Sequence, residues 1–169
     1  ITKIHPTTTT LTKALNYIQN PKKTDGTLLV DGYGCVPETA YQQFMRTKEK
    51  VDKKDGYIAF HLIQSFSPGE VDYETAHKIG IELADKVFKG RFQYVIATHI
   101  DRGNVHNHII ANSVSFKDFG KYNSSPNSYY FIRRTSDMLC KEYGLSVVAE
   151  PKDKGKSHYE HSLDKMGQS

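Results

Sequence analysis

The chain contains 169 residues, of which 37% are hydrophobic and 25% are charged, and its net charge is +4. This length suits one domain with a hydrophobic core. The two cysteines, Cys35 and Cys140, are too few for a disulfide scaffold or a cysteine-rich zinc module. No apolar run approaches the roughly 20 residues needed to span a bilayer. We therefore expect a protein of the reducing cytoplasm without membrane insertion, whose mild positive charge permits a nucleic-acid partner without indicating one.

The first part of the chain predicts short strands alternating with helices. Thr10 precedes apolar residues that recur at intervals of three and four, which is typical of a helix with Thr10 as its N-cap. Pro37 is a favourable first residue for a second helix. In chain order, we predict a strand at residues 1–5, a helix at 11–20, a short strand at 27–30, a tight turn at 31–34 and a helix at 37–51.

The second part predicts longer strands and two further helices. Residues 57–66 are largely apolar on both strand faces, which favours a central position in a sheet. Asp72 is a good N-cap for the clearest helix, and Gly144 is a good C-terminal cap for the last one. In chain order, we predict a strand at 57–66, a helix at 72–88, strands at 92–100 and 106–114, a helix at 126–143 and a closing strand at 146–150.

The mixed order of these elements, with one clear antiparallel hairpin, predicts an α+β fold. We expect a mostly antiparallel sheet of about five strands with helices packed mainly on one face. Residues 1–150 would form one catalytic domain. Residues 151–169 are polar, lysine-rich and aperiodic, so we expect a tail or linker toward a missing C-terminal region.

Three of the eight histidines, His99, His106 and His108, lie within ten residues of one another. His106 and His108 are two residues apart, so on a strand both imidazoles leave the same face, and the predicted hairpin folds His99 back beside them. Three imidazoles with other positions open are expected of a catalytic metal site, although imidazole alone does not choose among Zn, Mn, Ni and Cu. Asp101, in the turn, could fix the tautomer of one ligand or act as a base.

The other histidines are more easily explained as structural or surface residues. His61 lies in the middle of a strand and could line the same face of the sheet, but we do not expect it to bind the metal. The histidines that we expect to have no part in metal binding are also His5, His77, His158 and His161.

The segment THIDRGNVHNHIIAN, Thr98 to Asn112, resembles the third motif of the relaxases, the mobilisation endonucleases of conjugative plasmids and integrative elements. Relaxases belong to the His-hydrophobic-His (HUH) class. In this chain the residue between the two histidines is Asn107, which is not hydrophobic. The segment TLTKALNYIQNP, Thr10 to Pro21, is similar to the family's first motif, which carries the nucleophilic tyrosine. The resemblance places that tyrosine at Tyr17.

A third segment, HLIQSFSPGE from His61 to Glu70, resembles the family's second motif, in which a serine, here Ser65, and an acidic residue lie close to the DNA. The resemblance covers about residues 2–151 with three motifs in order. It implies a palm-like domain of the HUH endonucleases that acts in the bacterial cytoplasm.

The resemblance implies a site- and strand-specific DNA endonuclease that nicks and rejoins one strand at an origin of transfer. Tyr17 would attack a phosphodiester, release a 3′ hydroxyl and hold the 5′ phosphate covalently. A phenol with a pKa of about 10 is a poor nucleophile at pH 7. It therefore needs a base, such as Asp101, or a cation, and a metal held by the three histidines of the cluster would polarise the phosphoryl oxygen. We expect Mn²⁺ or Mg²⁺, with Zn²⁺ or Ni²⁺ as alternatives.

The partners implied by the resemblance are single-stranded DNA of a transfer origin, accessory relaxosome proteins and a coupling protein. Arg102, in the catalytic turn, is the best candidate for a phosphate contact. Asn112 falls at the family's asparagine position, where it would orient a ligand or a nucleotide. Weaker candidates for DNA contact, each more easily explained as a solvated charge, are Lys22, Lys23, Lys121, Arg133 and Arg134.

Three alternative functions stay open from the sequence. A rolling-circle replication initiator shares the histidine cluster, but its tyrosine usually follows that cluster, whereas Tyr17 precedes it by about 80 residues. A metal-dependent hydrolase that uses bound water would form no covalent adduct. A noncatalytic DNA-binding module would bind DNA in a salt-sensitive manner without the three histidines.

Overall fold

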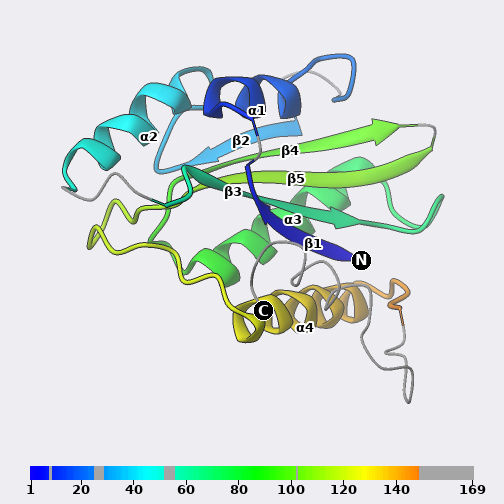
Figure 1. Ribbon diagram of the computed structural model, residues 1–169. Helices are drawn as coiled ribbons and strands as arrows, with labels where there is room; N and C mark the ends of the chain where they lie inside the picture. The colour runs from blue at the N-terminus through cyan, green and yellow to red at the C-terminus, as the bar shows by residue number, and fades with distance from the viewer. Residues whose placement is uncertain (8, 25–28, 52–55, 102, 149–169) are drawn as a thin grey trace.

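The computed structural model describes residues 1–7, 9–24, 29–51, 56–101 and 103–148. In this part of the chain, five strands form one sheet in the order β1-β3-β5-β4-β2, and each neighbouring pair is antiparallel (Figure 1). The α+β prediction with a five-stranded antiparallel sheet is therefore confirmed. The strands are β1 Thr2–Pro6, β2 Val30–Tyr33, β3 Ala59–Ser65, β4 Tyr94–Asp101 and β5 Asn104–Asn112.

Two of the helices begin at the N-caps that the sequence predicts, Thr10 and Asp72. The hydroxyl of Thr10 accepts a hydrogen bond from the backbone N–H of Lys13 at 3.3 Å, and the carboxylate of Asp72 accepts one from the N–H of Thr75 at 2.7 Å. The helices are α1 Leu11–Ile18, the 3₁₀ helix η2 Pro37–Thr39, α2 Ala40–Glu49, α3 Tyr73–Phe88 and α4 Pro126–Glu142.

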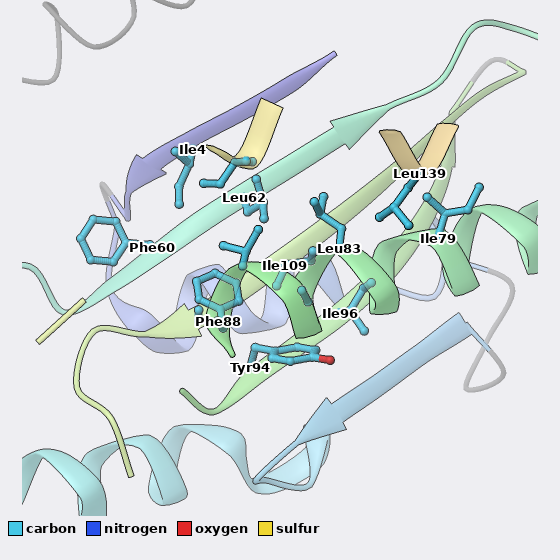
Figure 2. Packing of buried hydrophobic residues seen from close by; sticks show 14 of the residues in the cluster. Ile4, Phe60, Leu62, Ile79, Leu83, Phe88, Tyr94, Ile96, Ile109 and Leu139 are labelled. Atoms are coloured by element: carbon cyan, nitrogen blue, oxygen red, sulfur yellow. The ribbon is translucent and has the colours of Figure 1, made fainter. Parts of the chain in front are cut away.

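Helices cover both faces of the sheet, so the expectation that they pack mainly on one face is wrong. In Figure 1, α1 and α2 lie on one side of the sheet and α3 and α4 on the other. The reason is the sequence of the central strands, because successive apolar residues of β5 point to opposite faces. Ile109 joins the larger core under α3 and α4, shown in Figure 2, whereas Ile110 packs beneath α1 and α2.

Two predicted strands differ from the structure, the one at residues 27–30 and the one at residues 146–150. The second strand is Val30–Tyr33, so the predicted turn at 31–34 forms most of the strand, and residues 27 and 28 lie outside the described part. Its pairing with β4 is completed by the rings of Tyr33 and Tyr94, which stack at 5.5 Å.

Residues 146–148 form no strand. The backbone N–H and the hydroxyl of Ser146 both donate to the carboxylate of Glu70, so a side chain takes the donor that a strand would need. Residues 149–169, which include the predicted tail, lie outside the described part. Among the helices described, none has the length and apolar character required to cross a membrane.

Candidate active site

The sheet brings the three clustered histidines to one face, beneath α1. His99 of β4 pairs directly with His106 of β5 in the antiparallel register, and His108 follows two residues later on the same face. The ring centroids of His99 and His108 are 4.1 Å apart, and those of His106 and His108 are 6.2 Å apart. The convergence predicted from the spacing is therefore present in the fold.

Helix α1 presents Tyr17 to these imidazoles. The buried face of α1 packs on the small residue Ala97 and on Ile110, and Tyr17 lies beside that face with 53% of its surface exposed. Its ring meets His99 edge-on at 5.9 Å and His108 at 6.0 Å between centroids. The tyrosine identified by the motif thus lies at the histidine cluster although it is about 80 residues away in the sequence.

A pocket of about 350 Å³ contains this constellation. Ser65, from the second motif, contributes to its wall, and the lysines in the wall make it suitable for a polyanion. We refer to it as the histidine pocket. It is lined by Ile1, Lys3, Tyr17, Lys23, Ile63, Ser65, His99, His106 and His108.

Each imidazole of the cluster has a hydrogen-bond partner that restrains its ring. Nε2 of His99 donates to the backbone carbonyl of Ile18 at 2.7 Å, which ties β4 to the end of α1. Nδ1 of His106 lies 3.0 Å from the hydroxyl of Ser65. Nδ1 of His108 lies 2.9 Å from Nε2 of a fourth histidine, considered next.

Two further histidines adjoin the cluster: His61, which the strand pattern allows on this face, and His5, which was not expected here. They face each other across β1 and β3 with their ring centroids 5.1 Å apart, and His61 lies at the same distance from His108. The alternation of β3 placed His61 on the correct face, but the pairing with β1 that adds His5 is set only by the tertiary fold.

Burial keeps the two innermost imidazoles neutral at pH 7. Burial, and secondarily the neighbouring histidines, lowers the pKa of His108 to about 2 and that of His61 to about 3, from the ordinary 6.5. A neutral imidazole is the form that coordinates a metal ion.

The donor set of the histidine pocket fits a divalent metal that accepts nitrogen ligands. The three imidazoles share one face, each has a hydrogen-bond partner, and His108 is neutral. Within the described residues, however, no group of three His, Cys, Asp or Glu side chains already has ligand geometry. His99 and His108 pack ring against ring instead, so their rings would have to turn to coordinate an ion.

Polar side chains on the opposite face lock the strands that carry the cluster. Asn107, between His106 and His108, is fully buried and donates from Nδ2 to the carbonyl of Ala76 at 2.7 Å and to Oε1 of Gln64 at 3.0 Å. Its Oδ1 therefore accepts a hydrogen bond from another residue, the hydroxyl of Thr98, at 2.6 Å. Asn107, in place of a hydrophobic residue between the two histidines, thus takes part in an interior hydrogen-bond network.

The same network extends to His77. Because the single hydroxyl hydrogen of Thr98 goes to Asn107, Thr98 must accept from Nδ1 of His77, at 2.7 Å. Nε2 of His77 lies 2.6 Å from the carboxylate of Asp31 and donates to it. His77 thus links Thr98 of β4 to Asp31 of β2, on the side of the sheet away from the histidine pocket.

The remaining predicted site residues differ in their placement. Asp101 is the last residue of β4, two positions after His99, and Arg102 lies outside the described residues. Asn112 is fully buried, and its Nδ2 donates to the carbonyl of Phe44 at 3.2 Å. This interior position does not support the predicted contact of Asn112 with DNA; the residue instead joins β5 to α2.

Comparison with known proteins assigns the family. The family model described as "Relaxase: MobA/VirD2-like, nuclease domain" matches residues 17–145. The protein rlx of Staphylococcus aureus is 36% identical over 140 residues, covering 83% of this chain and 42% of the relative. The group II intron-interrupted relaxase LtrB of Lactococcus lactis is 30% identical over 194 residues, covering 90% of this chain and 34% of the relative. The chain thus spans less than half the length of these relatives.

A solved structure described as "Molecular Basis of Vancomycin Resistance Transfer in Staphylococcus aureus" has the same fold. Its TM-score is 0.60 at 11% sequence identity, and the match covers 90% of this chain and 98% of that chain. The family model and the sequence relatives show that the chain belongs to the MobA/VirD2-like relaxase nuclease family.

Proposed function

We propose that the chain nicks one DNA strand at an origin of transfer by transesterification and rejoins it, with Tyr17 as the nucleophile. The observation that carries this proposal is the edge-on packing of the Tyr17 ring against His99 and His108 at the histidine pocket. The family assignment favours this function over that of a rolling-circle initiator.

The reaction exchanges one phosphoester for another. The phenol of Tyr17 gives its proton to the proposed base, Asp101, and its oxygen forms a bond to the scissile phosphorus. The bond from phosphorus to the 3′ oxygen breaks, and the 3′ oxygen takes up a proton. The 5′ phosphate remains on Tyr17, and attack by the 3′ hydroxyl reverses the step without ATP. Tyr17 is half exposed, so a DNA strand in the pocket can reach it, while the hydrogen bond from His99 to Ile18 holds the end of α1 in place.

We assign the metal to His99, His106 and His108, with Mn²⁺ or Mg²⁺ expected. A divalent ion there would polarise the phosphoryl oxygen and offset the charge that develops on it. Ser65 positions His106 through their 3.0 Å contact. Asp101 remains the proposed base, and Arg102 a proposed phosphate contact.

The substrate that we propose is single-stranded DNA of the element's own transfer origin. Lys3 and Lys23 in the pocket wall would pair with its phosphates. We further propose that the chain works with accessory relaxosome proteins and a coupling protein in the cytoplasm of a bacterium.

The test incubates the chain with single-stranded origin DNA and Mn²⁺ or Mg²⁺ and separates the products on a denaturing gel. We expect a covalent protein–DNA adduct with the unchanged chain, none with Tyr17→Phe, and none after addition of a chelator. Equal cleavage by both proteins without an adduct would instead support the water-using hydrolase. Binding without any cleavage, retained after loss of the three histidines, would support the noncatalytic module.

A further inference from the structure

Tyr17 also lines a second pocket, of about 450 Å³, that shares no other residue with the histidine pocket. We call it the threonine pocket, because Thr7 and Thr9 contribute to its wall together with His5, Lys13 and His61. The two pockets follow one another along the same strands. On β1, Lys3 belongs to the histidine pocket and His5 to the threonine pocket.

The spacing of the two pockets suits a nucleic-acid backbone. Lys3 and His5 are two residues apart on one strand, which places them about 6.5–7 Å apart. This is comparable to the separation of adjacent phosphates in an extended single strand. On β3, Ser65 and His61 follow the same division between the two pockets. A strand lying along β1 and β3 would therefore cross Tyr17 between two neighbouring phosphates.

The chemistry of the threonine pocket suits an anion. No Asp or Glu lines it within the described residues, and Lys13 contributes a positive charge. Nδ1 of His5 donates to the carbonyl of Pro6 at 2.9 Å, which fixes the orientation of the ring in the pocket wall. The hydroxyl oxygen of Thr7 is shielded from solvent and has no hydrogen-bond partner among the described residues.

We propose that the threonine pocket binds the DNA phosphate next to the scissile phosphate, with Lys13 as its charge partner and Thr7 as a hydrogen-bond partner. The inference rests on the proposed function for the identity of the substrate. It gives the pocket the role of holding the strand in register over Tyr17, separately from the chemistry in the histidine pocket. His61, which lines the threonine pocket and contacts His108, joins the two sites.

The first test measures how the affinity for single-stranded origin DNA depends on salt, using fluorescence anisotropy without added metal. Loss of one phosphate contact lowers the slope of log Kd against log salt by about 0.7 for a single strand. We expect this change for Lys13→Gln. The matched control is Lys86→Gln, an exposed lysine of α3 on the other side of the sheet, for which we expect an unchanged slope. Equal slopes for Lys13→Gln and the unchanged chain would overturn the inference.

The second test locates the contact with oligonucleotides that carry a single neutral methylphosphonate on one side or the other of the nick. At one of these two positions, we expect the unchanged chain to lose roughly 10-fold in affinity and Lys13→Gln to lose nothing further. If the methylphosphonate and Lys13→Gln each weaken binding separately at both positions, so that the two fold-losses in affinity multiply, the assignment of Lys13 to this phosphate is contradicted. Both tests measure binding, so they can succeed even if Tyr17 forms no adduct, and the adduct assay can succeed even if they fail.

Discussion

Nε2 of His61 lies 2.9 Å from Nδ1 of His108, and the contact links the central strand β5 to its neighbour β3 at the active site. If His108 coordinates a metal through Nε2, its Nδ1 carries the hydrogen and donates to His61. The contact then fixes both the tautomer and the ring orientation of the proposed ligand, a role that carboxylates or backbone carbonyls fill in many metal sites.

Replacing His61 should therefore weaken metal binding without removing a ligand. We expect His61→Phe to lower the affinity for Mn²⁺ by roughly 10–100-fold, because Nδ1 of His108 loses its acceptor. His61→Gln, which keeps an acceptor oxygen, should lose less. Isothermal titration calorimetry measures both affinities, and equal binding by His61→Phe and the unchanged chain would refute the orienting role.

Gly80 lets α3 approach the strand that carries His106 and His108. A Cβ atom at this position would lie 2.5 Å from Nδ2 of Asn107 and 2.6 Å from Cδ1 of Ile96. We expect Gly80→Ala to lower the free energy of unfolding by roughly 1–3 kcal/mol, although alanine is the better helix former by about 1 kcal/mol. Urea unfolding measures the change, with exposed Lys86→Ala as the control; a stabilised Gly80→Ala would show that the interface is looser than described.

We expect Lys48 to make the stability of the folded chain change with pH in the alkaline range. Burial, and secondarily the charge of Lys121, lowers the pKa of Lys48 to about 8 from the ordinary 10.5. Between these values the unfolded chain keeps a proton that the folded chain has released, so this group's contribution to stability rises with pH. Below pH 8 both states are charged and burial of the charge destabilises the folded state.

We therefore expect Lys48→Met to melt about 2 °C above the unchanged chain at pH 7, and the difference to shrink by pH 10. The hydroxyl of Ser113, which accepts a hydrogen bond from Lys48, still donates to the carbonyl of Ile58 in the variant. Calorimetry at both pH values gives the two differences. A difference that is constant with pH would mean that Lys48 does not titrate in this range.

The sequence allowed the centre of the site to be predicted because its elements are local. The interval from His106 to His108 and the turn before it determine which face these imidazoles share. Tyr17 came from the motif resemblance alone, since its helix pattern is equally consistent with core packing. His5 was missed because only the pairing of β1 with β3, between residues far apart in the sequence, brings it to His61.

The fold was predictable where capping and periodicity act within one element, as at Thr10 and Asp72. The strand at Val30–Tyr33 was displaced in the prediction because Gly32 and its neighbours have the composition of a turn, whereas pairing with β4 draws them into the sheet. The burial of Asn112 depends on partners such as Phe44 that no local pattern identifies.

The role of Tyr17 as nucleophile is tested by identifying the residue that carries the DNA. Trypsin cleaves after Lys13 and Lys22, and Tyr17 is the only tyrosine in the peptide between these sites. The adduct formed with origin DNA is digested with trypsin and nuclease and analysed by mass spectrometry. We predict a nucleotide linked through its 5′ phosphate to Tyr17 in that peptide. A nucleotide on any other residue, or cleaved DNA with no modified peptide, would contradict it.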